Sequence, residues 1–154
     1  MGSRKKNKYN ILWLAMFSSS FIYLAVVFFL RNSASPPAVG SMLVFALAGV
    51  AGACLVASVI LFKIMFAPDK IKSFSGFHQF TSYFQQKAII SMSLMADIGV
   101  IGIVLKALGY PSLYAISFII AGAAGMIVHR LQAEALWKSV VEDPALMAKM
   151  NMMN

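Results

Sequence analysis

The chain has 154 residues, of which 60% are hydrophobic and 12% are charged. Soluble domains carry about 25% charged residues, so this composition excludes an ordinary soluble domain and indicates an integral membrane protein. The formal net charge is +8, but the basic residues are scattered over the ends of apolar segments, which argues against a nucleic-acid partner. The single cysteine, Cys54, excludes an intrachain disulfide and a multi-cysteine metal site.

Four apolar runs are each long enough to cross a bilayer, which takes about 20 helical residues. They cover residues 11–30, 39–66, 88–109 and 112–131, and they leave a loop at 67–87 and a tail at 132–154. A basic N-terminus before the first run is also typical of a secretory signal. The run is longer than the roughly 7–15 residues of a signal's apolar region, so we expect an uncleaved span. The sequence therefore predicts an all-α membrane protein with four transmembrane helices in a single domain.

The connections between these runs contain residues that end helices. Arg31–Pro37 combines small polar residues with two prolines, and Gly109-Tyr110-Pro111 predicts a tight turn. Asp143 and Pro144 are typical of a helix start in the tail. All lysines and arginines except Arg31 and Lys106 fall on one side of the predicted spans. The positive-inside rule then places both termini and the 67–87 loop in the cytoplasm, with the chain in the inner (cytoplasmic) membrane.

The loop between the second and third spans carries apolar residues at helical spacing. Ile71 is followed at intervals of three or four by aromatic residues that would lie at the membrane interface: Phe74, Phe77, Phe80 and Phe84. We expect an interfacial helix over Ile71–Phe84, lying on the bilayer. Gly76 in its middle favours the alternative, an aromatic-rich loop. A lipid-facing scaffold built on this segment is one functional hypothesis.

The two halves of the chain resemble each other. Residues 89–108 align with residues 11–30, and the pattern A-G-x-A-G occurs at 48–52 and again at 121–125. This pattern predicts two helical hairpins related as a parallel repeat; alternatively, small residues simply recur wherever membrane helices touch. Small residues four apart favour close helix packing, within the bundle or between copies. They are Gly49, Ala53, Ala57, Ser117, Ala121 and Gly125.

Asp97 is the only acidic residue inside a predicted span. A carboxylate at that depth costs about 2.5–3.5 kcal/mol on insertion scales, so it needs a proton, a partner or a function. The repeat places Asp97 at the depth of Ser18, Ser19 and Ser20, and Ser93 lies one turn before it. One hypothesis is a hydrogen bond between a protonated Asp97 and these serines that joins the first and third spans. The other is a binding site for a proton or a monovalent cation with serine oxygens as ligands.

Other polar residues give weaker signals. His129 and Arg130 end the fourth span, where a boundary role is more typical than chemistry, and His78 lies in the loop. The sequence contains no nucleophile–base pair, phosphate loop or zinc spacing, so we expect no enzymatic activity, no cofactor and no metal. The expected partners are the lipid bilayer and either further copies of the chain or other membrane subunits.

The segment Met95–Leu105 (MADIGVIGIVL) resembles the carboxylate helix of the proteolipid (c-type) subunits of rotary ATPases. Both have an acidic residue amid small residues, followed by an apolar run with glycine. The family carries its carboxylate on the second helix of a hairpin, whereas Asp97 is on the first, and the spacing from acid to glycine is one residue shorter here. The resemblance implies an ion-binding carboxylate at Asp97.

Overall fold

The computed structural model describes residues 2–30 and 42–152, which are helical with short connections. The helices are α1 (Gly2–Phe29), α2 (Met42–Met65), α3 (Pro68–Lys72), α4 (Phe77–Ala107), α5 (Ser112–Val141) and α6 (Pro144–Met152). Four of them, α1, α2, α4 and α5, are long and apolar enough to cross a membrane, so the predicted all-α, four-span fold is confirmed. The turn predicted at Arg31–Pro37 lies outside the described residues.

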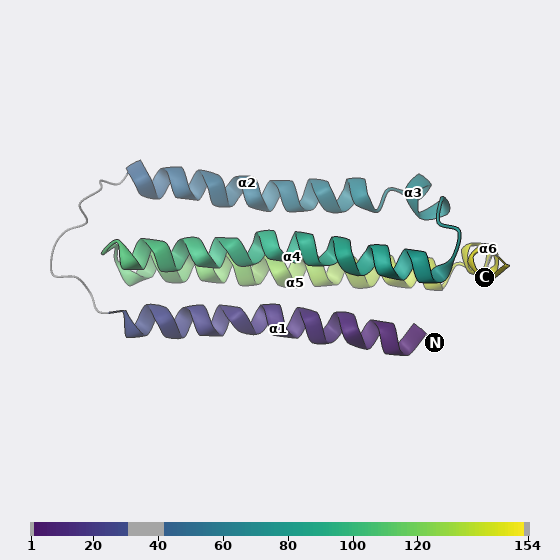
Figure 1. Ribbon diagram of the computed structural model, residues 1–154. Helices are drawn as coiled ribbons and strands as arrows, with labels where there is room; N and C mark the ends of the chain where they lie inside the picture. The colour runs from purple at the N-terminus through teal and green to yellow at the C-terminus, as the bar shows by residue number, and fades with distance from the viewer. Residues whose placement is uncertain (1, 31–41, 153–154) are drawn as a thin grey trace.

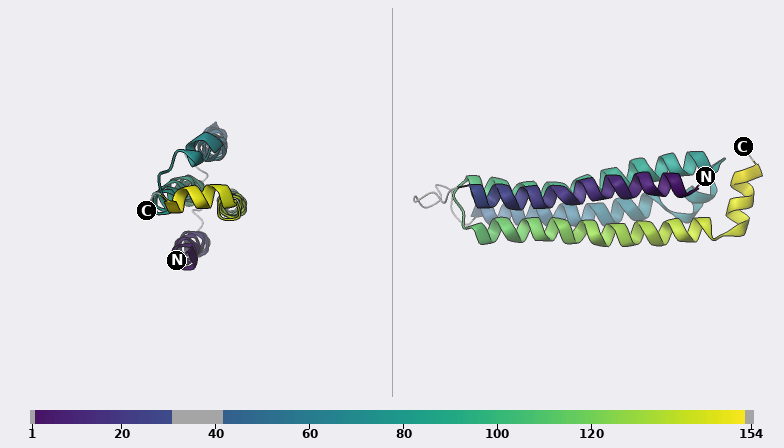
Figure 2. Two further views of the ribbon diagram at one scale, coloured as in Figure 1. Left: turned by 90° about the vertical axis from the view of Figure 1, so that its right-hand side faces the viewer. Right: turned by 90° about the horizontal axis from the view of Figure 1, so that it is seen from below.

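The four long helices are not arranged as two equivalent hairpins. Helices α4 and α5 lie side by side at the centre, while α1 and α2 pack on opposite sides of this pair (Figures 1 and 2). The expectation of two packed hairpins is therefore wrong for the first half of the chain. The physical reason is visible in α2, where a Cβ atom added at Gly49 or Gly52 would meet no atom within 4 Å. Gly49 and Gly52 thus bring no helix close.

Glycines bring α4 and α5 into close contact. A Cβ atom at Gly122 would lie 2.6 Å from the Met95 carbonyl oxygen, and one at Gly102 would lie 2.5 Å from the Ala115 carbonyl oxygen. Only glycine therefore lets the two backbones approach this closely. Gly122 belongs to the A-G-x-A-G pattern at 121–125, but neither glycine is among the small residues four apart that were expected to pack.

A tight turn joins the two central helices, as predicted. Gly109 adopts a positive φ of 87°, which favours glycine. Its N–H donates to the Lys106 carbonyl, and the N–H of Tyr110 donates to the Leu105 carbonyl, the two hydrogen bonds of a Schellman motif. Helix α5 then begins directly after Pro111, which is its N-cap residue with φ −53° and ψ 140°.

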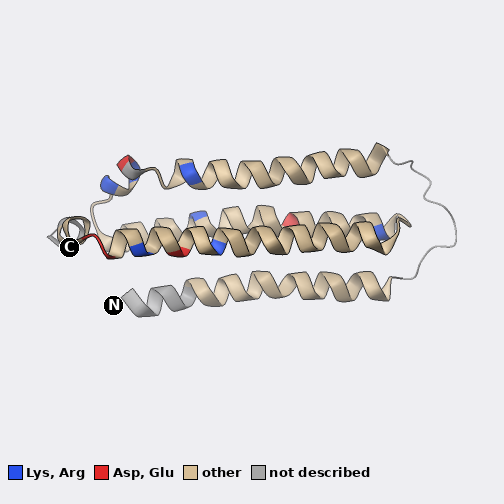
Figure 3. Ribbon diagram, turned by 180° about the vertical axis from the view of Figure 1, so that it is seen from behind, with Lys and Arg blue, Asp and Glu red and all other residues tan. Residues whose placement is uncertain are grey.

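The beginning of α1, the short helix α3 and the C-terminal helix α6 lie at one end of the bundle (Figure 1). Most Lys and Arg residues in the described part of the chain lie toward this same end (Figure 3). Helix α6 starts as predicted, because the carboxylate Oδ1 of Asp143 accepts hydrogen bonds from the N–H groups of Ala145 and Leu146. We call this end of the molecule the basic end.

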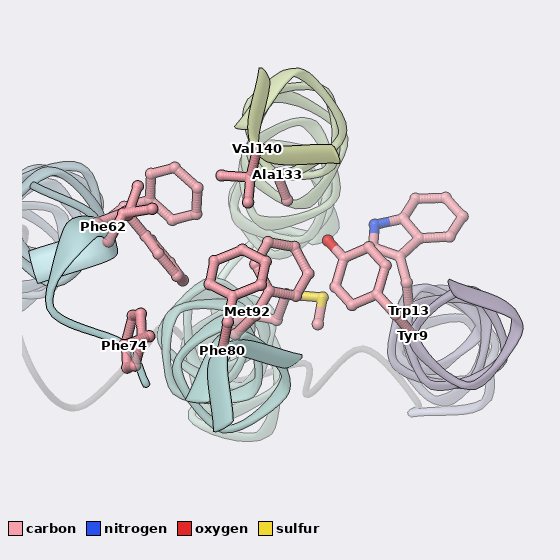
Figure 4. Close-up of a cluster of buried hydrophobic side chains, with 12 residues drawn as sticks. Tyr9, Trp13, Phe62, Phe74, Phe80, Met92, Ala133 and Val140 are labelled. Atoms are coloured by element: carbon pink, nitrogen blue, oxygen red, sulfur yellow. The ribbon is translucent and has the colours of Figure 1, made fainter. Parts of the chain in front are cut away.

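Aromatic side chains fill the core at the basic end (Figure 4). The expected interfacial helix over Ile71–Phe84 is wrong, because α3 ends at Lys72 and α4 begins only at Phe77. Phe74, Phe80 and Phe84 are buried, and Phe77 is half-buried. The rings of Phe80 and Phe84 pack against Trp137 of α5. They therefore stabilise the contact between α4 and α5 and do not lie on the membrane surface.

Candidate functional site

Asp97 lies on the side of α4 that faces away from the bundle. Its side chain is exposed, whereas Ile98, the next residue, is fully buried between the helices. Ile90, Val100 and Val104 are exposed on the same side, at spacings of three, four and seven residues that bring them together on a helix. We call this surface the open face of α4 and define it by Ile90, Ser93, Asp97, Val100 and Val104.

The structure does not bring Asp97 to the serines of α1. Ser18 Oγ donates a hydrogen bond to the Leu14 carbonyl at 2.7 Å, and Ser19 Oγ donates to the Met16 carbonyl at 2.6 Å. Ser20 is buried on the packed side of α1. The hypothesis of a hydrogen bond joining the two helices through Asp97 is therefore wrong, because these hydroxyls of Ser18 and Ser19 bond to their own helix and Asp97 points away from α1.

Ser93 and Asp97 do share one surface, one helical turn apart. Within the described residues, no hydrogen bond or ion pair links Asp97 to another group, and no three His, Cys, Asp or Glu side chains cluster as a metal site. The open face therefore presents a carboxyl and a hydroxyl to whatever surrounds the helix.

The small residues that were expected to pack have different surroundings in the two halves. Gly49, Ala53 and Ser117 are exposed, and Ala57 is half-buried. In the second half, Ala121 packs in the middle of the bundle, and a Cβ atom at Gly125 would collide with the Met95 sulfur. Of the predicted set, Ala121 and Gly125 thus pack within the bundle, while Gly49, Ala53 and Ser117 do not.

A chain of three polar groups, which the sequence analysis did not identify, crosses the bundle on the opposite side of α4. The hydroxyl oxygens of Ser58 (α2) and Ser91 (α4) lie 2.6 Å apart, and Ser91 Oγ lies 3.4 Å from His129 Nδ1 (α5). All three residues are buried, and the ring of Phe62 packs edge-on against the imidazole. The other ring nitrogen, His129 Nε2, is buried and has no hydrogen-bond partner among the residues that the structure describes.

A groove lies next to this polar chain, because α2 packs on α4 and barely touches α5. Its volume is about 380 Å³, and its walls are mostly apolar. Helix α2 contributes Leu55, Ser58 and Val59, and α4 contributes Met95. Helix α5 contributes the remaining lining residues: Ala121, Ala124, Gly125, Val128, His129 and Gln132. Ser58, Ser91 and His129 come from the second, third and fourth predicted spans, at similar depth. This matching depth is the feature of the sequence from which the polar chain could have been predicted.

Arg130 lies on the other side of α5 from the groove and contacts α1. Its guanidinium carbon is 4.2 Å from the centroid of the Trp13 ring, and its Nε is 3.5 Å from the Glu134 carboxylate. The Trp13 indole N–H donates to the Met126 carbonyl at 3.2 Å. These contacts suit the boundary role that the sequence predicted for Arg130, whereas His129 belongs to the buried chain.

Comparisons with protein-family models, curated proteins and solved structures found no match to this chain.

Proposed function

We propose that the chain is a non-enzymatic structural or accessory subunit of a membrane complex or homo-oligomer, and that the open face of α4 is its contact with another protein helix. The observation that carries the proposal is the exposure of Asp97 amid exposed apolar residues in a membrane-spanning helix. A lipid-facing carboxyl at that depth is costly, about 2.5–3.5 kcal/mol on insertion scales, and a polar group on a neighbouring helix removes that cost.

The fold supports this proposal in a second way. Helix α4 is packed by α5, α2 and α1 on its other sides, so the open face is the remaining surface of a helix held in place along its length. Ser93 and Asp97 offer a donor and an acceptor on this rigid surface. A facing helix with small or polar residues could therefore dock without any rearrangement of the bundle.

We also propose the orientation and the membrane. Most of the described basic residues lie at the end that holds α3 and α6 (Figure 3). The positive-inside rule makes this the cytoplasmic end, in an inner membrane, with both termini in the cytoplasm.

The second candidate function is binding of a proton or a monovalent cation at Asp97 in a translocating assembly, as the resemblance to proteolipid subunits implies. The observation that favours it is that Asp97 and Ser93 lie together on a surface that another subunit can approach. Ions would then reach the carboxyl only at the contact with that subunit.

Two substitutions of Asp97 separate these functions. Asp97→Asn keeps a hydrogen-bonding side chain but cannot exchange a proton, whereas Asp97→Leu removes all polarity. For a structural contact, we expect Asp97→Leu to lose the complex in native membranes, Asp97→Asn to keep most of it, and ion flux in vesicles to be unchanged. Loss of flux in Asp97→Asn with the complex intact would favour the ion-binding function. Wild-type assembly and flux in both variants would contradict both proposals.

Two single-cysteine variants test whether the open face of α4 is the contact surface. In a Cys54→Ala background, Val100→Cys lies on the open face, and Ile120→Cys lies exposed on α5. We expect oxidative cross-linking in native membranes for Val100→Cys and none for Ile120→Cys. A product of twice the chain mass would identify a second copy, which carries the same introduced thiol, and any other mass a different subunit with a cysteine thiol at the contact. Equal cross-linking at both positions would contradict a specific contact.

A further inference from the structure

We propose that the groove between α2 and α5 binds one acyl chain of an anionic membrane lipid, with an oxygen of the lipid's ester or headgroup hydrogen-bonded to His129 Nε2. This site lies on the opposite side of α4 from the open face and is independent of the proposed function. Its ligand is a lipid, not a protein helix.

The groove has the size and lining of a ligand site. Its volume of about 380 Å³ lies within the range of roughly 300–1,000 Å³ that is typical of small-molecule pockets. Small side chains on α5, namely Ala121, Ala124 and Gly125, leave the space that a larger side chain would fill. An apolar, narrow cavity that opens beside a membrane-spanning helix suits an alkyl chain.

The polar groups of the groove gather at one end of it. Helix α5 runs toward the basic end of the molecule, so His129 and Gln132 lie nearer that end than Ala121 does. On α2, Leu55 lies farther from the basic end than the polar Ser58, and Lys63, one turn after Val59, is exposed. An acyl chain in the apolar part would therefore carry its headgroup toward an exposed ammonium group, and this charge favours an anionic headgroup.

His129 provides the N–H group that would donate a hydrogen bond to an oxygen of the lipid. Its side chain is only 4% exposed, and a buried polar atom without a partner is costly, so the unpaired Nε2 indicates a missing hydrogen bond. When Ser58 donates to Ser91 and Ser91 donates to Nδ1, the imidazole carries its proton on Nε2. The remaining N–H then needs an acceptor, which the ester and phosphate oxygens of a phospholipid supply. The ring has to turn slightly toward the groove to meet that oxygen.

The experiment uses the full chain in vesicles of phosphatidylcholine that contain a small fraction of a probe lipid. The probe is phosphatidylglycerol or phosphatidylcholine with a photoreactive diazirine on one acyl chain, and labelled residues are mapped after illumination. We expect phosphatidylglycerol to label the groove walls around Leu55 and Ala124 more strongly than phosphatidylcholine does.

Two adjacent substitutions provide a matched test. Val128 lines the groove, whereas Ile127 does not line it and is exposed elsewhere on α5, and the two side chains are similarly exposed, at 52% and 45%. We expect Val128→Trp to abolish labelling of the groove walls and Ile127→Trp to leave it unchanged. Equal labelling in both variants, or an equal loss in both, would overturn the proposal. If Val128→Trp instead breaks an oligomer while groove labelling persists, the groove is a protein contact and the proposal fails.

Variants of His129 test the oxygen contact. His129→Gln keeps an N–H donor near the position of Nε2, whereas His129→Leu keeps the volume and loses the donor. We expect His129→Leu to lose the preference for an ester-linked probe over an ether-linked one and to keep the preference for phosphatidylglycerol, which the Lys63 charge favours, and His129→Gln to retain both. Retention of the ester preference in His129→Leu would overturn the role of Nε2. Circular dichroism of each variant shows whether it is folded. If His129→Leu is unfolded, the labelling of Val128→Trp alone tests whether the groove binds lipid.

Discussion

The two faces of α4 carry polar groups in opposite situations. On the open face, Asp97 is exposed, and no described residue bonds to it. On the packed face, Ser91 is fully buried and bridges Ser58 and His129 of two other helices. The residue type that stands out in an apolar sequence thus points away from the bundle, while the inconspicuous serine links three helices. This difference indicates that the packed face holds the fold together and the open face is available for another molecule.

The largest expected effect concerns the aromatic core at the basic end. Phe80 is fully buried, whereas Phe45 of α2 is 74% exposed. We expect Phe80→Ala to lower the free energy of unfolding by about 3–5 kcal/mol, the typical cost of such a cavity. Chemical unfolding in detergent measures this change, and Phe45→Ala, the matched control, should cost far less. Similar losses in both variants would contradict the burial of Phe80.

The next effect concerns the glycine contact between α4 and α5. We expect Gly122→Leu to destabilise the bundle by about 1–3 kcal/mol or more, because the new side chain would collide with the backbone of α4 at Met95. Gly49→Leu is the control, since a Cβ atom there meets nothing within 4 Å. Circular dichroism monitors the thermal unfolding of both variants in detergent, and their unfolding temperatures are compared. A stable Gly122→Leu would show that α4 and α5 do not approach so closely.

A smaller effect is expected for the buried polar chain. Ser91→Ala removes the bridging hydroxyl and leaves the Ser58 hydroxyl and His129 Nδ1 with fewer partners, at a cost of about 1–3 kcal/mol. Ser139→Ala is the matched control, because Ser139 is exposed and bonds only to the Leu136 carbonyl of its own helix. Unfolding by denaturant measures both variants, and a neutral Ser91→Ala would mean that the three groups are not coupled.

The smallest expected effect is on the pair that the sequence suggested. In the purified chain, a double-mutant cycle of Asp97→Ala and Ser19→Ala should give a coupling energy below about 0.5 kcal/mol, as for residues that do not interact. Ser19 bonds to the Met16 carbonyl, so neither substitution removes a bond between helices. A coupling energy above about 1 kcal/mol would restore the direct contact between α1 and α4.

Apolar run length was enough to predict the spans, because a bilayer demands long uncharged helices whatever their neighbours are. The Gly109 turn and the Asp143 cap were also predictable, since both depend on local chemistry. The pairing of helices was not, because small residues at equal spacing occur on the exposed Gly49 side and on the packed Gly125 side alike.

Asp97 and the buried polar chain also differ in how far the sequence could predict them. The identity of Asp97 was enough to mark it, but whether it faces a neighbour depends on the rotation of α4 about its axis. The polar chain of Ser58, Ser91 and His129 comes from three helices, and each residue alone is ordinary near the end of a span. The burial of Phe74, Phe80 and Phe84 was not predictable, because helical spacing alone does not distinguish a membrane surface from a protein core.

Photo-cross-linking from the open face tests the central claim most directly. A benzophenone amino acid replaces Val100 on the open face or, as control, Ile120 on the exposed side of α5, and native membranes are illuminated. If the open face is a protein contact, position 100 will give a discrete protein adduct and position 120 will give lipid adducts alone. Lipid adducts alone at both positions would contradict the account.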